Sequence, residues 1–206
     1  MATARRIGAE SSKTRTNLLD ATEQLMRDEG YAAVSSRQVA AKAGLKPQLV
    51  HYYFRTMDDL FLAVFQRLAD QLMKRQTQVL ISDQPLRGLW ELSNDASIAV
   101  LSTEFMALAN HRKVIRAEIA RFGELFRDMR VEVLTRILKK HRVGTGVCPP
   151  ISLAVVLESL ARVLVLEGTL GMSKGHAETR ALVERYIKRF EVRQPTKKRV
   201  SAQRRR

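Results

Sequence analysis

Apolar residues recur along this chain every three or four positions, and no stretch alternates convincingly at period two for more than a few residues. The spacing i, i+3, i+4 and i+7 from Leu18 to Leu25 predicts a first helix over Lys13–Glu29, which Gly30 ends. Helical spacing of this kind continues through most of the chain. The pattern therefore predicts an all-α protein of about nine helices.

Two short helices follow the first. Ser36 is a suitable N-cap for a helix that runs to Ala43, and Gly44 can adopt the left-handed conformation that ends it. The next helix begins near Lys46, with Pro47 in its first turn, where the missing N–H costs nothing. A turn of two residues thus joins two helices of about eight residues each.

Longer helices are expected after this pair. Thr56 caps a fourth helix that extends to about Leu80, and Asp58 and Asp59 lie at the positive end of its dipole. A turn at Ser82 to Pro85 separates it from a second block of helices. We expect these over residues 86–93, 96–109, 112–142, 150–171 and 177–191.

The short helix over residues 46–54 has two different faces. At 100° per residue, one arc is apolar and can pack on the preceding helices; it holds Leu49, Val50, Tyr53 and Phe54. The opposite arc carries groups that form hydrogen bonds, and it holds Pro47, Gln48, His51 and Tyr52. We expect this second arc to project outward.

Such an arrangement is typical of a helix-turn-helix unit, which places its second helix in the major groove of DNA. Gln and His can match the donors and acceptors of base edges, and Tyr, Lys and Arg commonly reach phosphates. The alternative is an ordinary corner of two helices with polar residues facing water. Two consecutive aromatics beside a histidine on so short a helix favour DNA.

The run GYAAVSSRQVAAKAGLKPQLVHYYFRTMDDL, residues 30–60, resembles the DNA-binding head of the TetR family of bacterial transcriptional regulators. The resemblance covers roughly residues 13–65. It rests on an aromatic after the helix-ending glycine, a pair of hydroxyl residues, the Val-Ala and Ala-Gly pairs of the second helix, the Tyr-Tyr-Phe end of the third helix and the acidic start of the fourth.

The resemblance implies a homodimeric regulator with a helix-turn-helix head and a helical body that binds a ligand. Ser36 would cap its helix against a phosphate; Lys46, Gln48 and His51 would face bases or backbone; Tyr52 and Thr56 would contact phosphates. Arg37 is a further phosphate candidate, because it starts a helix whose N-terminus favours anions. Met57 stands where a phosphate-binding lysine is usual in the family, and Arg55 or Lys46 could supply that charge instead.

The net charge is +15, which points to polyanionic partners. Seven basic and no acidic residues lie in the tail over residues 193–206, whereas residues 1–60 carry nine basic and seven acidic residues. We expect this tail, and the basic N-terminal arm over residues 1–12, to be disordered. The tail could grip nucleic acid nonspecifically, so a nonspecific or architectural nucleic-acid-binding protein is the alternative function.

Other chemistry finds little support. One cysteine, Cys148, cannot form an internal disulfide, and no pair of Cys or His residues has zinc-ligand spacing. No nucleophile-base set or phosphate-binding glycine loop is present, so we expect no enzyme and no cofactor. The N-terminus lacks an apolar signal segment, and the longest apolar run is interrupted by Glu158 and Arg162. A cytoplasmic protein without a membrane span is expected.

The helices after residue 58 are expected to dimerise and to enclose a ligand. The helix over 150–171 is apolar nearly all round and the last helix has an apolar stripe, so we expect both in a four-helix dimer interface. Its candidate residues are Val156, Leu160, Leu164, Val183, Tyr186, Ile187 and Phe190. A cavity for an apolar or amphipathic effector would draw on bulky side chains, which could equally be ordinary core; these are Trp90, Phe105, Met106, Phe122, Phe126 and Met129.

These expectations divide the chain into the arm, a helix-turn-helix domain over residues 13–57, a regulatory and dimerisation domain over 58–192, and the tail. The function they favour is a repressor that binds a palindromic DNA operator as a homodimer and is released by a small molecule.

Overall fold

A computed structural model describes residues 13–144, 146 and 148–191. Within these residues the regular structure is entirely helical, as predicted. The predicted arm over residues 1–12 and the basic tail over 193–206 lie outside the described residues.

The first three α-helices form a compact unit. They are α1 (Lys13–Glu29), α2 (Ser36–Lys42) and α3 (Pro47–Tyr53), with a short 3-10 turn over Tyr31–Ala33 between the first two. Gly30 and Gly44 take φ values of +82° and +66°, which only glycine adopts readily, and the chain turns at both. We call residues 13–56 the head.

The body consists of six further helices, which agree with the predicted ranges to within two residues at each end. These are α4 (Met57–Leu80), α5 (Pro85–Ser93), α6 (Ala96–Ala109), α7 (Lys113–Lys140), α8 (Pro150–Thr169) and α9 (His176–Phe190).

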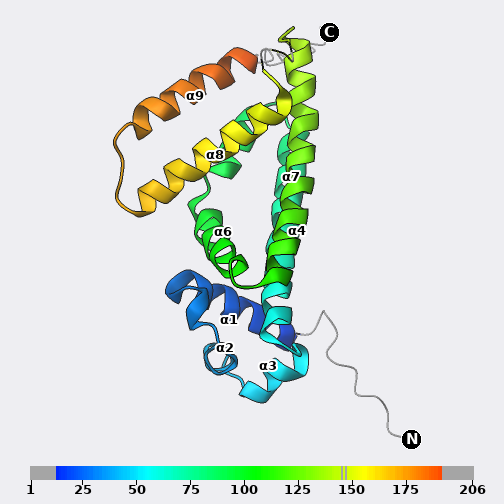
Figure 1. The fold of residues 1–206 in the computed structure, drawn as a ribbon, viewed down its shortest axis with the longest axis vertical. Coiled ribbons are helices and arrows are strands. Elements are labelled where there is room, and N and C mark those ends of the chain that lie inside the picture. The colour runs from blue at the N-terminus through cyan, green and yellow to red at the C-terminus, as the bar shows by residue number, and fades with distance from the viewer. Residues whose placement is uncertain (1–12, 145, 147, 192–206) are drawn as a thin grey trace, which may run out of the picture.

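The helices α4 and α7, of 24 and 28 residues, are the longest helices in the described part of the chain. Figure 1 shows them running side by side from the head to the opposite end, and α8 packs against α7. At 1.5 Å per residue, the 24 residues of α4 span about 36 Å. Because α4 begins directly after α3, a displacement of this helix in the body moves the head.

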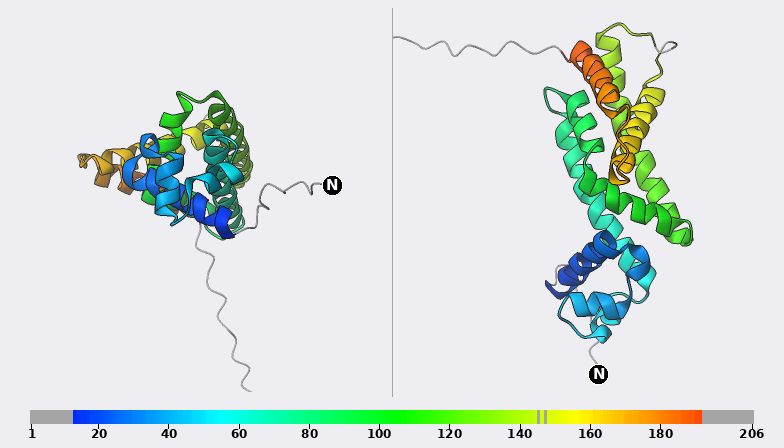
Figure 2. Two further views of the ribbon diagram at one scale, coloured as in Figure 1. Left: turned by 90° about the horizontal axis from the view of Figure 1, so that it is seen from below. Right: turned by 90° about the vertical axis from the view of Figure 1, so that its left-hand side faces the viewer.

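One apolar core joins the head to the lower body. It includes Leu18, Val39 and Val50 of the head, Leu60 and Val64 of α4, and further residues of α6 and α7. A second core, around Trp90, Leu134 and Ala161, joins α5, α7, α8 and α9 at the other end. Two views at right angles show the head protruding from one end of the body (Figure 2).

Helix ends correct one prediction and confirm another. The N-cap of α2 is Ser35, whose Oγ accepts a hydrogen bond from the N–H of Gln38, so the assignment of the cap to Ser36 was wrong. The predicted cap of α4 is confirmed: Thr56 Oγ1 accepts from the N–H of Asp59, and the Asp59 carboxylate accepts from the N–H of Thr56. This reciprocal pair is a capping box and fixes the corner between α3 and α4.

Candidate functional site

The helix α3 has the two faces that its sequence predicts. Val50 and Phe54 are buried against the head core, and Leu49 and Tyr53 are half-buried. The opposite face is exposed and holds Pro47, Gln48, His51 and Tyr52. Since α3 lies at the end of the molecule away from α8 and α9, the body does not cover this face (Figure 1).

The other predicted DNA contacts surround α3. Lys46 precedes the helix, Thr56 follows it, and Arg37 lies in the first turn of α2; all three side chains are exposed. Ser36 is half-buried in the same turn as Arg37. The head thus presents a short helix with hydrogen-bonding groups outward and cations beside it. Contact of these residues with DNA stays a prediction.

Packing within the head holds this surface in place. The Arg15 guanidinium lies 5.2 Å from the centre of the Phe54 ring, a cation–π distance, and the Tyr52 and Tyr53 rings meet edge to face at 5.1 Å. At the junction of α2 and α3, the N–H of Leu45 donates to the carbonyl of Ala40 at 2.8 Å. The helices of the unit therefore have a defined relative position.

Polar contacts attach the head to the body through α6, and a further ion pair lies at the start of α4. The N–H of Tyr31 donates to Glu104 Oε2 at 2.7 Å, and Arg27 donates to the carbonyl oxygen of Ser97. Arg112, just before α7, pairs with Asp58 at 2.8 Å. Any shift of α6 is thus transmitted to the end of α1.

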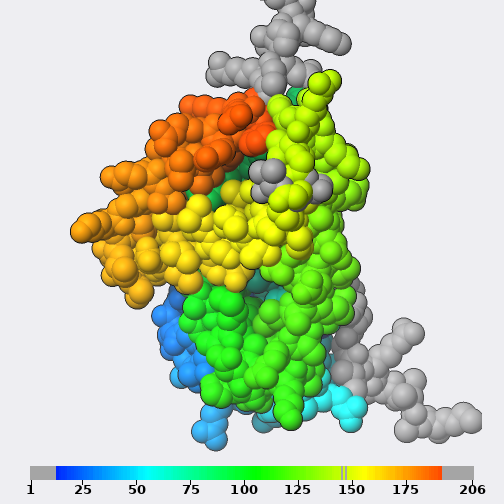
Figure 3. Space-filling model, turned by 45° about the horizontal axis from the view of Figure 1, so that its top comes forward, coloured from blue at the N-terminus to red at the C-terminus, as the bar shows by residue number. Residues whose placement is uncertain are grey.

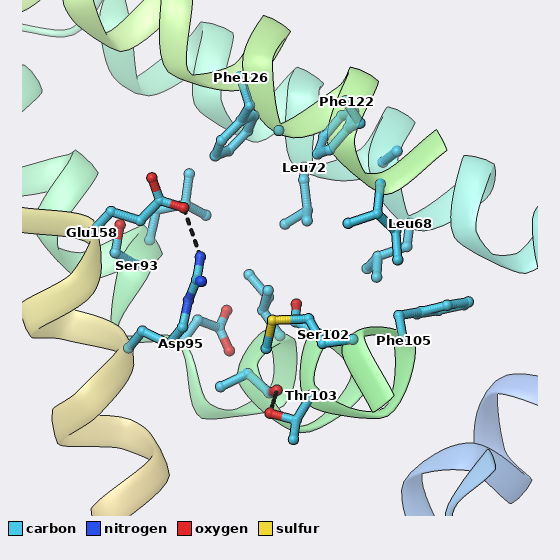
Figure 4. Close-up of a pocket in the computed structure, with 18 of the residues that line it drawn as sticks. Leu68, Leu72, Ser93, Asp95, Ser102, Thr103, Phe105, Phe122, Phe126 and Glu158 are labelled. Atoms are coloured by element: carbon cyan, nitrogen blue, oxygen red, sulfur yellow. Dashed lines mark hydrogen bonds and ion pairs between the residues drawn. The ribbon is translucent and has the colours of Figure 1, made fainter. Parts of the chain in front are cut away.

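A cavity of about 310 Å³ lies in the body between α4, α6, α7 and α8. Its walls include the predicted residues Phe105, Met106, Phe122 and Phe126. Figure 4 shows Phe122 and Phe126 along one side and Glu158 with Ser93 at one end. A volume near 300 Å³ is at the lower limit of small-molecule sites.

Two predicted cavity residues lie elsewhere. Trp90 is buried in the second core, and Met129 is half-buried with its sulfur 4.0 Å from the Gln76 amide. Neither lines the cavity. Helical spacing alone identified bulky residues on α5 and α7 but not which way each helix is turned. The structure adds Phe65, Leu68 and Leu72 from α4, none of which was predicted as a cavity residue.

The cavity also has a charged end. Glu158 and Arg162 pair at 2.7 Å on α8, and Arg127 and Arg130 of α7 face the same carboxylate. Burial lowers the pKa of Arg130 from its ordinary value, although Glu158 opposes this. The sequence does indicate that Arg130 is unusual. Phe122, Phe126, Arg130 and Leu134 follow one another at intervals of four residues on one side of the helix, and an apolar residue is expected at position 130.

Arg130 is hydrogen-bonded to Gln76, a second polar residue at an otherwise apolar position. Gln76 continues the row of Leu68 and Leu72 on α4 and is completely buried. Its Oε1 accepts from Arg130 Nε at 2.7 Å, and its Nε2 donates to the carbonyl of Phe126 at 2.8 Å. Buried polar groups are retained only when paired, so the two exceptional residues satisfy each other and tie α4 to α7 beside the cavity.

The predicted dimer residues divide into two groups. Leu164, Val183 and Ile187 are buried in the second core of the chain itself, and Leu160 and Phe190 are half-buried beside it, so these side chains pack within one chain. A role for them in a dimer interface stays a prediction. Val156 and Tyr186 are exposed, at 58% and 55%.

Neighbouring apolar side chains extend the two exposed residues into a surface, which we call the apolar strip. It comprises Ile151, Val155, Val156 and Val163 of α8 with Leu182 and Tyr186 of α9. The two helices lie beside each other at the surface in Figure 3. Because α8 is apolar nearly all round, its periodicity could not separate the inner side from the outer one.

In the described residues, no group of three or more His, Cys, Asp or Glu side chains could hold a metal ion. No helix in the part of the chain that the structure describes is long and apolar enough to cross a membrane.

In the described residues, a helix-turn-helix head with an exposed α3 face stands on a helical body that contains a cavity, an arrangement found in DNA-binding regulators. Residues 18–64 match the family model of the bacterial regulatory proteins of the tetR family. The head of this chain is therefore similar to the heads of tetR-family regulators.

A curated relative supports the head assignment. Over 67 residues the chain is 33% identical to the HTH-type transcriptional regulator BetI of Rhizobium meliloti (strain 1021). This match spans 32% of the present chain and 32% of BetI, so it covers about a third of that relative's length.

Solved structures extend the likeness to the body. A TetR transcription regulator from Haloarcula marismortui superimposes with a TM-score of 0.69 at 18% identity, over 84% of this chain and 96% of that one. A transcriptional regulator from Saccharomonospora viridis in complex with choline gives a TM-score of 0.67 at 20% identity, over 84% and 94%. At these identities the comparison shows a common fold.

Proposed function

We propose that this protein is a ligand-responsive transcriptional regulator of the cytoplasm. As a homodimer it binds a two-fold symmetric DNA operator and represses transcription. The observation that carries the proposal is the exposed Gln48, His51 and Tyr52 face of α3, in a head that matches the TetR family. This role requires no catalytic group.

Dimerisation is supported by the apolar strip. Its six large apolar side chains are each between 39% and 58% exposed, and exposed apolar side chains gathered on adjacent elements commonly mark an interface. An isologous dimer through α8 and α9 places the two heads on the same side. Each recognition helix then enters a major groove about one helical turn, roughly 34–36 Å, or slightly more from the other.

Ligand response is supported by the cavity and by what surrounds it. The helices α4 and α6 line the cavity, and both also reach the head, one by continuity and the other through Glu104 and Ser97. A molecule that separates α4 from α7 alters the angle of the head, and the two heads then no longer fit adjacent grooves. A regulator of similar fold was crystallised in complex with choline, which supports a small-molecule effector for this protein.

The test is DNA binding by the full-length chain with His51 and Tyr52 both changed to Ala. Binding to the promoter DNA beside its own gene is followed by fluorescence anisotropy, with a scrambled duplex for comparison. We expect the double variant to lose at least tenfold in affinity for the promoter and to bind both duplexes equally, because base-edge and phosphate contacts are removed together. Unchanged affinity and preference would refute the role of α3.

Two controls sharpen the result. His111→Ala removes an exposed histidine from the body and should leave binding unchanged. Deletion of residues 193–206 tests the alternative of a nonspecific binder: the regulator keeps its promoter preference with a shallower salt dependence, whereas a protein driven by its tail loses all binding.

A further inference from the structure

The charged end of the cavity contains more cations than its one carboxylate can satisfy. Glu158 Oε1 accepts a hydrogen bond from Arg162 at 2.7 Å. Its other oxygen, Oε2, lies 3.7 Å from Arg127 Nη2 and 3.8 Å from Arg130 Nη1. Both distances exceed that of a hydrogen bond, so these two guanidinium groups experience the charge of Glu158 without bonding to it.

No other acidic group of the cavity wall supplies the missing charge. Asp95 pairs with Arg75 at 2.9 Å and also accepts hydrogen bonds from Ser97, and these bonds lower the pKa of its carboxyl. Its charge is therefore already matched. Of the remaining wall residues, only Arg127, Arg130, Arg162 and Glu158 are ionisable, which leaves this end of the cavity with a net positive charge.

Arg130 is held in position for a ligand. Its side chain is 6% exposed, its guanidinium lies 4.6 Å from the centre of the Phe126 ring, and its Nε is bonded to Gln76. Burial lowers the pKa of Arg130, Glu158 opposes this, and the positive charges of Arg162 and Arg127 lower the pKa further. A second anion beside it would relieve that repulsion, and fixed guanidinium groups bind carboxylates strongly.

The rest of the cavity is apolar. Figure 4 shows Phe122, Phe126 and Leu72 between the Glu158 end and an opposite end formed by Leu68 and Phe105. At about 30 Å³ for a water-sized group, 310 Å³ accommodates roughly ten such groups in a row or a ring system of similar size. The site is thus elongated in character, with cations at one end and aromatic walls along the remainder.

We propose that the effector is an amphipathic monoanion, a carboxylate on an apolar body of about ten carbon atoms, whose head group binds between Arg127 and Arg130. This inference rests on the proposed function, in which the cavity is the effector site. The incoming carboxylate takes over the guanidinium donors that Glu158 does not reach. Because Arg130 is bonded to Gln76 of α4, occupation of this site acts directly on the helix that leads to the head.

A cationic effector does not fit this arrangement. Glu158 is the acidic group at this end, and it is already surrounded by three arginines. A ligand cation would have to displace Arg162 and would then face the two remaining positive charges in a medium of low dielectric constant.

The experiment uses the full-length protein and three probes with the same ten-carbon chain: decanoate, decyltrimethylammonium and decanol. Isothermal titration calorimetry measures each affinity directly. We expect decanoate to bind at least tenfold more tightly than either of the others. Equal or tighter binding of the cation would overturn the proposal, as would equal binding of the neutral alcohol.

Substitutions of Arg127 and Arg130 then test whether the carboxylate head group binds between these two side chains. Arg130→Met and Arg127→Met should each weaken decanoate binding at least tenfold without weakening decanol, and Arg127→Met remains informative if Arg130→Met fails to fold. Arg121→Met, on the exposed side of the same helix and outside the cavity, is the matched control and should change nothing. Unchanged affinity in the Arg127 variant would contradict the proposal.

The substitution Glu158→Gln distinguishes an anion site from a cation site most clearly, because the two predict opposite changes in ligand affinity. Removing the internal carboxylate frees the arginines for the ligand, so decanoate should bind more tightly, whereas a cation site would bind its ligand more weakly. A decrease for decanoate overturns the assignment. Promoter binding of the wild type without probe is measured in parallel. A wild type that binds the promoter but not decanoate refutes the effector class alone, and a wild type that does not bind DNA refutes the proposed function.

Discussion

Two adjacent serines open α2, and the structure gives them different surroundings. Ser35 has an extended backbone and accepts the hydrogen bond from Gln38, whereas Ser36 is already helical and is half-buried. Sequence preference alone does not separate two neighbouring hydroxyl residues, because either can cap a helix. Which one does so depends on where the chain leaves the Tyr31–Ala33 turn.

This difference predicts that alanine substitutions at the two serines affect different properties of the protein. Ser35→Ala should lower the free energy of unfolding by about 1 kcal/mol, the usual cost of a lost cap. Ser36→Ala should change stability by less than about 0.5 kcal/mol but weaken operator binding, if its hydroxyl contacts a phosphate as proposed. Urea unfolding and anisotropy measure the two quantities. A larger stability loss in the Ser36 variant would contradict the cap assignment.

At the scale of elements, α6 has two functions on its two sides. Ile98, Ser102 and Phe105 face the cavity or the core beside it, while Glu104 accepts the hydrogen bond from the head at Tyr31. One helix therefore contacts both the effector cavity and the DNA-binding unit. Coupling between two binding sites is reciprocal, so DNA bound at the head should also change the behaviour of α6.

Hydrogen exchange can detect this coupling without any effector. In the wild type, operator DNA should slow amide exchange across residues 96–109. In Glu104→Ala, the Tyr31 amide loses its acceptor and should exchange faster, and the response of α6 to DNA should diminish while the head still binds. Glu124→Ala, an exposed change on α7, is the control. An undiminished response in the Glu104 variant would exclude this route.

At the scale of the whole molecule, the apolar residues of α8 and α9 divide into those that pack inside one chain and those that are exposed and available for a dimer interface. Val183 and Val156 are both apolar residues on the last two helices, yet the first is 5% and the second 58% exposed. The first therefore stabilises each chain, and the second is available to a partner. The apolar strip, rather than the stripe read from the last helix, is the proposed interface.

Substitutions on the two sides should act differently. Val156→Asp and Tyr186→Asp place a charge in the proposed interface and should convert the dimer to monomers, as measured by size-exclusion chromatography with light scattering. Val114→Asp, an equally exposed change on α7, should leave the dimer intact. Val183→Ala should lower stability by about 1 kcal/mol or more and retain the dimer. A dimer that survives both strip variants would place the interface elsewhere.

The sequence by itself determined the helices and the character of α3. Helix ranges follow from local periodicity, caps and glycines, and the two faces of α3 follow from residues within two turns of each other. Each of these signals is short in range, which explains why the ranges from Lys13 to Phe190 were predicted to within two residues.

Only the tertiary structure decided which apolar residues form core, cavity or outer surface. Trp90 became core and Phe65 cavity wall, Val183 is inside and Val156 outside, because each outcome depends on how a helix is rotated against distant neighbours. The meeting of Gln76 with Arg130 is of the same kind. Each stands in an apolar row of its own helix, and only packing of α4 on α7 brings the two together at 2.7 Å.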